Sequence, residues 1–161
     1  MNATDLARYL SANDIDAEIV FLDEETPTVE SAAAAVGVKP EQIIKSVLFV
    51  VKEDEETYRP LLVVANGLSR IDYKKLAAHL EVSRRRVRIA RPDQVAAITG
   101  YPVGTVPPFG HKTPLPTLVE AGVMVQEEVY AGAGAINALV HLSTTTLQQV
   151  VDGEIIALTA S

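Results

Sequence analysis

The chain has 161 residues, 48% of them hydrophobic and none of them cysteine, with a formal net charge of −7. This length and hydrophobic content suffice for one buried core, so we expect a single domain spanning residues 1–161. The absence of cysteine excludes disulfides, thiolate nucleophiles and cysteine-ligated metals. No apolar run approaches the roughly 18 residues that span a bilayer, and no basic-then-apolar leader is present, so we expect a cytoplasmic protein without a membrane partner.

The first half of the chain alternates between helical and extended patterns. Apolar spacing and capping residues predict, in chain order, a helix over Asp5–Ala12, a strand over Ala17–Leu22, an alanine-rich helix from a Thr28 cap to Gly37, and two buried strands, Ile43–Val51 and Arg59–Ala65. An acidic break separates the last two strands, which therefore form a hairpin.

The second half continues this mixture. It predicts a helix over Asp72–Leu80, a strand over Val87–Ala90, a helix over Pro92–Ile98, strand-like runs over Thr117–Val129 and Ile136–Leu142, a helix from Ser143 or Thr144 to Val151, and a strand over Glu154–Leu158. The order lacks strict βαβ regularity. We therefore expect an α/β fold with a mixed sheet partly wrapped by helices.

Charge is segregated along the chain. The segment from Arg70 to Arg91 holds eight basic and two acidic residues, so it carries +6 while the remainder carries −13. A basic island on an acidic body could contact a phosphate backbone, and a solvated helix-and-strand face would look the same.

The twelve residues Gly100–His111 contain three glycines and three prolines, which exclude both helix and regular strand. Proline fixes φ whereas glycine permits φ > 0 and close approach of the backbone, so the mixture specifies a rigid loop. Such a loop is typical of a binding site, and a structural crossover between elements is an equal alternative.

Lys45 is the one charged residue in the run Ile43–Val51. An ammonium group in a buried sheet must meet an anion, lose its proton or reach solvent, because desolvating it without a partner costs several kcal/mol. We interpret Lys45 as a candidate ligand-binding residue, with snorkelling of its stem to the surface as the alternative.

Other catalytic patterns are missing. The sequence around Lys112 lacks the glycine that a nucleotide-binding P-loop places before its lysine, no GxSxG motif is present, and the three histidines have no metal-ligand spacing. We therefore expect no metal and no cofactor. The remaining candidates are a lysine, a glycine–proline loop and a second glycine site at Gly132 and Gly134. Together they suit an anionic ligand. The protein could either bind this ligand without reaction or hydrolyse it, by positioning it and stabilising an oxyanion.

The order of several segments resembles a known family. These segments are Thr28 with its alanine-rich helix, IKSVLF at Ile44–Phe49, DYKKL at Asp72–Leu76, TGYPVG at Thr99–Gly104 with PFG at Pro108–Gly110, and the glycines Gly132 and Gly134 before a strand. Together they resemble the YbaK and prolyl-tRNA synthetase-associated (ProX, INS-like) editing domains, which hydrolyse mischarged aminoacyl-tRNA. The similarity runs from about residue 16 to the end.

The resemblance implies a single α/β domain whose mixed, partly antiparallel sheet is curled and barrel-like, with helices around it. It implies that Lys45 acts in catalysis by meeting the phosphate or ribose of the tRNA 3′-terminal adenosine, while backbone groups around Gly100, Gly104 and Gly110 frame the ester. The residues implied to line the substrate site are Thr28, Ser46, Gly100, Tyr101, Gly104, Pro108, Phe109, Gly110, His111, Gly132, Gly134 and Asn137.

The implied partner is the 3′ acceptor end of aminoacyl-tRNA, with Arg84, Arg85 and Arg86 as candidate tRNA contacts. The implied activity is deacylation in trans of a tRNA, tRNA(Pro) among the candidates, that carries a small amino acid such as alanine, serine, cysteine or proline. Two alternatives remain open. The chain could be a non-catalytic tRNA- or nucleotide-binding module, or a domain that associates with a synthetase.

Overall fold

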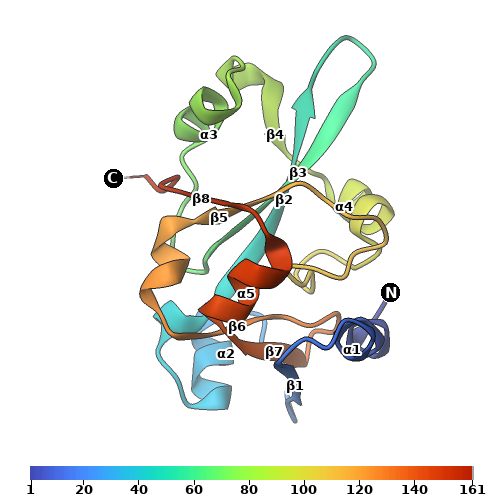
Figure 1. The fold of residues 1–161 in the computed structure, drawn as a ribbon, viewed down its shortest axis with the longest axis vertical. Coiled ribbons are helices and arrows are strands. Elements are labelled where there is room, and N and C mark those ends of the chain that lie inside the picture. Colours follow the sequence, from blue (N-terminus) through green and yellow to red (C-terminus); the bar gives the residue numbers. More distant parts are fainter. Residues whose placement is uncertain (161) are drawn as a thin grey trace.

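The computed structural model describes residues 1–160 as a mixed α/β fold, shown in Figure 1. The α-helices are α1 (Ala3–Ala12), α2 (Val29–Val36), α3 (Tyr73–Leu80), α4 (Pro92–Thr99) and α5 (Thr144–Val151). Short 3-10 helices are η1 (Pro40–Gln42), η2 (Arg84–Arg86) and η3 (Ala121–Val125). The strands are β1 (Ala17–Phe21), β2 (Ile44–Lys52), β3 (Tyr58–Asn66), β4 (Val87–Ile89), β5 (Thr117–Glu120), β6 (Glu128–Gly132), β7 (Ala138–Ser143) and β8 (Glu154–Ile156).

The strands form two sheets. Five strands pair in the order β4-β2-β3-β5-β8, with antiparallel pairing around β2 and parallel pairing of β5 with β3 and β8. The other three pair antiparallel in the order β1-β7-β6. The β2–β3 hairpin crosses the molecule, with its turn at the top of Figure 1 and the three-stranded sheet near the bottom.

The expectation of a curled, barrel-like sheet is wrong. Neither sheet closes on itself, because each ends in a strand that pairs on one side: β4 and β8 in the larger sheet, β1 and β6 in the smaller. Within residues 1–160, a single isolated bridge between Ile43 and Tyr130 joins the two sheets. One bridge cannot continue a hydrogen-bonded ladder around a barrel.

Local sequence signals explain most element boundaries. The Thr28 hydroxyl accepts a hydrogen bond from the Ser31 amide at 3.0 Å, and Gly37 ends α2 with φ +72°, so the predicted cap and stop are confirmed. Ser143 caps α5 in the same way. The predicted hairpin is also confirmed, since β2 pairs with β3 along its whole length.

One predicted strand is interrupted. The run Thr117–Val129 splits into β5, η3 and β6. The buried carboxylate of Glu120 accepts hydrogen bonds from the amides of Gly122 and Leu158, which turns the chain into η3 instead of letting it extend. The prediction of a continuous strand was therefore wrong for the middle of this run, because a side-chain cap outweighs its β-branched residues.

Alternate residues of β2 enter two separate cores. Leu48 and Val50 pack with α1 and the three-stranded sheet, whereas Phe49 packs with Leu76 of α3 on the opposite face. Side chains of successive strand residues point to opposite faces. Lys45 and Ser46, at the start of the same strand, therefore face opposite sides of the sheet.

Candidate functional site

A cavity of about 220 Å³ lies at the start of β2, and we call it the Ser46 cavity. It is bounded by the residues before α2, the first turns of α2, the start of β2, the loop at Gly104, the end of β6 and the start of β7. The lining residues are Thr26, Pro27, Thr28, Val29, Ala32, Ile43, Ile44, Lys45, Ser46, Gly104, Val106, Gly132 and Leu139. The structure thus brings together five of the site residues predicted from sequence: Thr28, Lys45, Ser46, Gly104 and Gly132.

The Thr28 hydroxyl is committed to the helix. It accepts from the Ser31 amide and donates to the Ser31 hydroxyl at 2.9 Å, while the Ser31 hydroxyl accepts from the Thr28 amide at 3.1 Å. This reciprocal cap fixes the direction of α2. Thr28 therefore positions the apolar wall that Val29 and Ala32 present to the cavity, and its own hydroxyl is already bonded.

Two glycines shape the opposite wall. Gly104 has φ +86° in a turn closed by the Thr105 amide bonding to the Pro102 carbonyl at 3.1 Å, and a side chain added at Gly104 would meet open space. At Gly132 the backbone approaches closely: an added Cβ would lie 2.7 Å from the Val106 carbonyl oxygen. Gly104 therefore leaves the cavity open, and Gly132 lets β6 pack against the loop.

Ser46 is the unpaired polar group of the cavity. Its Oγ atom is buried and, among residues 1–160, has no hydrogen-bond partner. A buried hydroxyl without a partner costs about 1–3 kcal/mol, so it is most favourable when a bound molecule completes its hydrogen bond. Thr26, Thr28 and Lys45 are the other residues with polar side chains in the lining, so Ser46 is one of four.

Lys45 borders the Ser46 cavity and a larger groove. Its half-buried ammonium group donates to the Ser69 carbonyl at 2.5 Å and lies 3.5 Å from the Gly67 carbonyl. Burial lowers the pKa of Lys45 below its ordinary value. An ammonium has three donors, and two carbonyls leave one for a ligand.

The groove beside Lys45 is electropositive, and we call it the Arg70 groove. Its volume is about 500 Å³, and its lining residues are Lys45, Val47, Phe49, Arg70, Ile71, Tyr73, Ile89 and Ala160. Among residues 1–160, the lining includes two cations, two aromatic rings and no acidic side chain. Such a combination suits a ligand that has both an anionic group and a flat ring.

The predicted basic residues reach this groove through Arg84. The Arg84 guanidinium lies 4.3 Å above the centre of the Tyr73 ring, so it adds charge beside the groove. Arg86 donates to the Glu53 carbonyl at 3.2 Å, and Arg85 is exposed. Of these three arginines, Arg84 is therefore the one that contacts a residue of the Arg70 groove.

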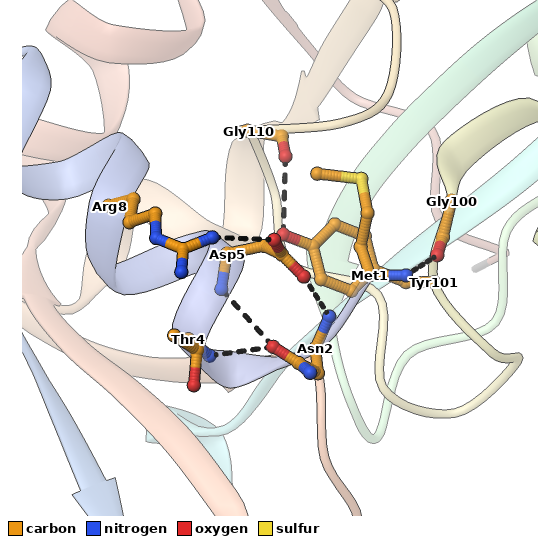
Figure 2. A network of polar contacts seen from close by, with 8 residues as sticks. All are labelled: Met1, Asn2, Thr4, Asp5, Arg8, Gly100, Tyr101 and Gly110. Atoms are coloured by element: carbon orange, nitrogen blue, oxygen red, sulfur yellow. Dashed lines mark hydrogen bonds and ion pairs between the residues drawn. The ribbon is translucent and has the colours of Figure 1, made fainter.

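The start of the Gly100–His111 loop is braced by the N-terminal residues. Figure 2 shows the Met1 amino group donating to the Gly100 carbonyl at 2.7 Å, and the Tyr101 hydroxyl donating to the Gly110 carbonyl at 3.3 Å. Tyr101 is fully buried, and burial, with a smaller contribution from the charge of Asp5, raises its pKa to about 12. Met1 and Tyr101 therefore stabilise the loop, and neither of them lines the Ser46 cavity.

The second half of the loop faces another hollow. Pro108, Phe109, Gly110 and His111 line a pocket of about 170 Å³ together with Tyr9, whose ring stacks on Phe109 at 5.9 Å. His111 Nε2 lies 2.7 Å from the Pro107 carbonyl oxygen, and burial lowers the pKa of this imidazole. A neutral ring donating to that carbonyl closes the loop on itself.

Two further predicted residues also lie outside the cavity. Gly134, with φ +85°, packs against the backbone of Asn2 and Ala3, where an added Cβ would come within 2.9 Å. The Asn137 side-chain amide donates to the Leu22 carbonyl at 3.4 Å and ties β7 to the end of β1.

Tyr73 was not among the predicted site residues, and Arg70 was predicted only as the first residue of the basic segment Arg70–Arg91. Both follow β3, whose antiparallel register pairs Ala65 with Lys45. A hairpin returns the chain after its second strand to the start of its first. The predicted hairpin was therefore the signal that could have placed these residues beside Lys45.

No three His, Asp or Glu side chains within residues 1–160 gather into a possible metal site. None of the helices in that part of the chain has the length and apolar character needed to cross a bilayer.

The chain is similar to an uncharacterized bacterial protein and to part of a proline–tRNA ligase. The protein YwhH of Bacillus subtilis is 26% identical over 132 residues, which are 82% of this chain and 80% of that protein. A proline–tRNA ligase of Solidesulfovibrio magneticus is 30% identical over 137 residues, which are 79% of this chain and 22% of the ligase. The match therefore spans a small part of that enzyme.

A solved structure shares nearly the whole fold. A protein described as a candidate trans-editing enzyme for prolyl tRNA synthetase superposes with a TM-score of 0.89 at 29% identity, over 99% of this chain and 97% of that one. The sequence profile of the aminoacyl-tRNA editing domain matches residues 23–150, which include the whole lining of the Ser46 cavity. By this match, the chain belongs to the aminoacyl-tRNA editing domain family.

Proposed function

We propose that the protein hydrolyses, in trans, the ester bond of tRNA mischarged with a small amino acid. The observation that carries this proposal is that Lys45 lines two differently built spaces: a small cavity beside the unpaired Ser46 hydroxyl, and a wider groove with two cations. An aminoacyl ester of a terminal adenosine has matching halves. Its aminoacyl group is small, and its nucleotide is anionic and aromatic.

The aminoacyl group would occupy the Ser46 cavity. Val29 and Ala32 limit its size from one side and Val106 from the other. The Ser46 hydroxyl would complete its hydrogen bonding on the substrate and orient the ester. A small cavity rejects larger side chains by overlap, whereas one methylene alters binding by only about 1–3 kcal/mol.

The terminal nucleotide would occupy the Arg70 groove. The free donor of Lys45 and the Arg70 guanidinium would bind the phosphate or the ribose, and the adenine could stack on Tyr73. This arrangement would hold the ester next to Lys45, which lines both spaces.

Hydrolysis would then depend on positioning. A water oxygen bonds to the ester carbonyl carbon, the bond to the ribose oxygen breaks, and the proton of the water passes to that oxygen through the substrate's own hydroxyl or amino group. No covalent enzyme intermediate is needed. Fixed geometry and a low-dielectric pocket supply the rate acceleration.

Filling the Ser46 cavity should block this reaction. Ala32→Leu adds volume to a buried wall residue, so we expect kcat/KM for the preferred aminoacyl-tRNA to fall by about tenfold or more. Ala34→Leu, on the exposed side of the same helix, is the matched control and should retain wild-type activity. Equal activity of the two variants in a deacylation assay would argue against this cavity as the aminoacyl pocket.

The basic island should contribute to tRNA affinity. Changing Arg84, Arg85 and Arg86 together to alanine should weaken binding and flatten the dependence of log K on log salt by roughly 0.7–0.9 for each phosphate that the protein no longer neutralises. The measurement is a salt titration of tRNA binding.

A charge-matched variant with Arg8, Lys39 and Lys112 changed to alanine alters three cations outside the island. It should keep the wild-type salt slope. Identical slopes for both triple variants would remove the island from the binding surface.

A further inference from the structure

The free edge of β1 is a surface that the Ser46 cavity and the Arg70 groove do not include. Strand β1 is terminal in the three-stranded sheet and pairs with β7 on one side. The Leu22 amide continues this pairing by donating to the Asn137 carbonyl at 2.7 Å. Because antiparallel hydrogen bonds alternate along a strand, Ile19 and Phe21 direct their amides and carbonyls away from β7.

A groove flanks this edge on each side. One, of about 460 Å³, lies between β1 and α1 and includes Ile19 in its lining. The other, of about 800 Å³, lies between β1 and α2 and includes Val20 and Phe21. Phe21 is 66% exposed although its side chain is large and apolar. An added strand would place alternate side chains on the two faces of the sheet, which is where the two grooves lie.

Both grooves are acidic. Asp14 and Glu18 line the first, and Asp23, Glu24 and Glu25 line the second. Among the residues that the structure describes, neither lining contains a lysine, an arginine or a histidine. Within residues 1–160, these five carboxylates form no ion pair, so their charges are available to a partner.

We propose that the β1 edge binds an extended, lysine- or arginine-bearing segment of another protein, which adds as a fourth strand to the β1-β7-β6 sheet. Main-chain hydrogen bonds to Ile19 and Phe21 supply affinity, and the carboxylates beside the edge select a cationic sequence. The surface is separate from the Arg70 groove, whose charge has the opposite sign. The proposal does not depend on deacylase activity.

The charge argues against two other occupants. Pairing of two β1 edges would bring the carboxylates of both copies together, which disfavours a second copy of this chain. A nucleic acid strand is repelled for the same reason.

Binding can be measured by fluorescence anisotropy with a labelled peptide of about eight alternating lysine and valine residues, long enough to cover the edge strand. We expect saturable binding that weakens with salt. Two control peptides are tested on the same wild-type protein. One has glutamate in place of lysine, and the other is N-methylated at alternate residues so that it cannot form the hydrogen bonds of an added strand. Neither should bind.

Two protein variants test the location. Combining Asp23→Asn, Glu24→Gln and Glu25→Gln should weaken peptide binding by about tenfold, since each exposed charge pair contributes modestly. The matched control removes three charges from the β2–β3 turn at the other end of the molecule (Figure 1) through Glu53→Gln, Glu55→Gln and Glu56→Gln. It should change the dissociation constant by less than about twofold.

Failure of the lysine–valine peptide to bind would overturn the proposal. Equal affinity for the N-methylated peptide, or equal weakening by both charge variants, would also overturn it. So would concentration-dependent dimerisation that the peptide does not reverse, because it would assign the edge to a second copy.

Discussion

Lys45→Ala is expected to lower kcat/KM for aminoacyl-tRNA hydrolysis by about a hundredfold or more. The half-buried ammonium borders both the Ser46 cavity and the Arg70 groove, and it retains a donor beyond its bonds to the Gly67 and Ser69 carbonyls. Removing one partner of a desolvated charge pair costs about 2–5 kcal/mol, which corresponds to this loss of rate. Single-turnover deacylation of the preferred aminoacyl-tRNA measures it.

The fold should survive this change. Burial lowers the pKa of Lys45, so the surroundings disfavour its charged form and its removal takes little stability away. The midpoint of thermal unfolding should stay within about 4 °C of the wild type. Lys52→Ala, at the far end of the same strand, is the control and should retain full activity. A folded Lys45→Ala protein with unchanged kcat/KM would refute the assigned role.

Gly132→Ala should be strongly destabilising for a change of one methyl group. The added Cβ would lie 2.7 Å from the Val106 carbonyl oxygen and 2.9 Å from that of Thr105, and these backbone atoms cannot move as a flexible side chain can. We expect a loss of roughly 2–3 kcal/mol in the free energy of unfolding and a thermal midpoint lower by roughly 5–10 °C. Activity should also fall, because both carbonyls belong to the loop that forms the cavity wall.

Gly37→Ala provides the comparison. Gly37 has φ +72° and nothing within 4 Å of an added Cβ, so it tests conformational strain without overlap. Gly37→Ala should lower the free energy of unfolding by about 1–2 kcal/mol and leave the deacylase activity unchanged. If Gly132→Ala unfolded no more easily than Gly37→Ala, the close approach of β6 to the Thr105–Val106 segment would not be a tight constraint.

Local chemistry made much of the fold predictable. Thr28 and Gly37 bound α2 because a hydroxyl cap and a left-handed stop act over a single turn. The β2–β3 hairpin followed from two β-branched runs with an acidic turn between them. The closure of the sheet was not predictable in the same way, since it depends on whether strands far apart in sequence pair. Within residues 1–160, a single bridge, at Ile43, joins the two sheets.

The candidate site was harder to predict than the fold. Lys45 was predictable as a site residue because a charged group in an apolar strand is unfavourable unless it has a partner. In the structure it lines both the Ser46 cavity and the Arg70 groove. The Gly100–His111 loop was correctly expected to be irregular, but residue types do not reveal which way a loop faces. Tyr101 and Phe109 face the interior behind it, while Gly104 faces the cavity.

The most direct test of the proposed function is the release of amino acid by the wild-type protein from tRNA charged separately with alanine, serine, cysteine and proline. Hydrolysis of at least one of these well above the uncatalysed rate, lost in the Lys45→Ala protein and retained in the Lys52→Ala protein, is the result we predict. Tight binding of all four charged tRNAs without any release would contradict it, and would assign the chain to binding alone.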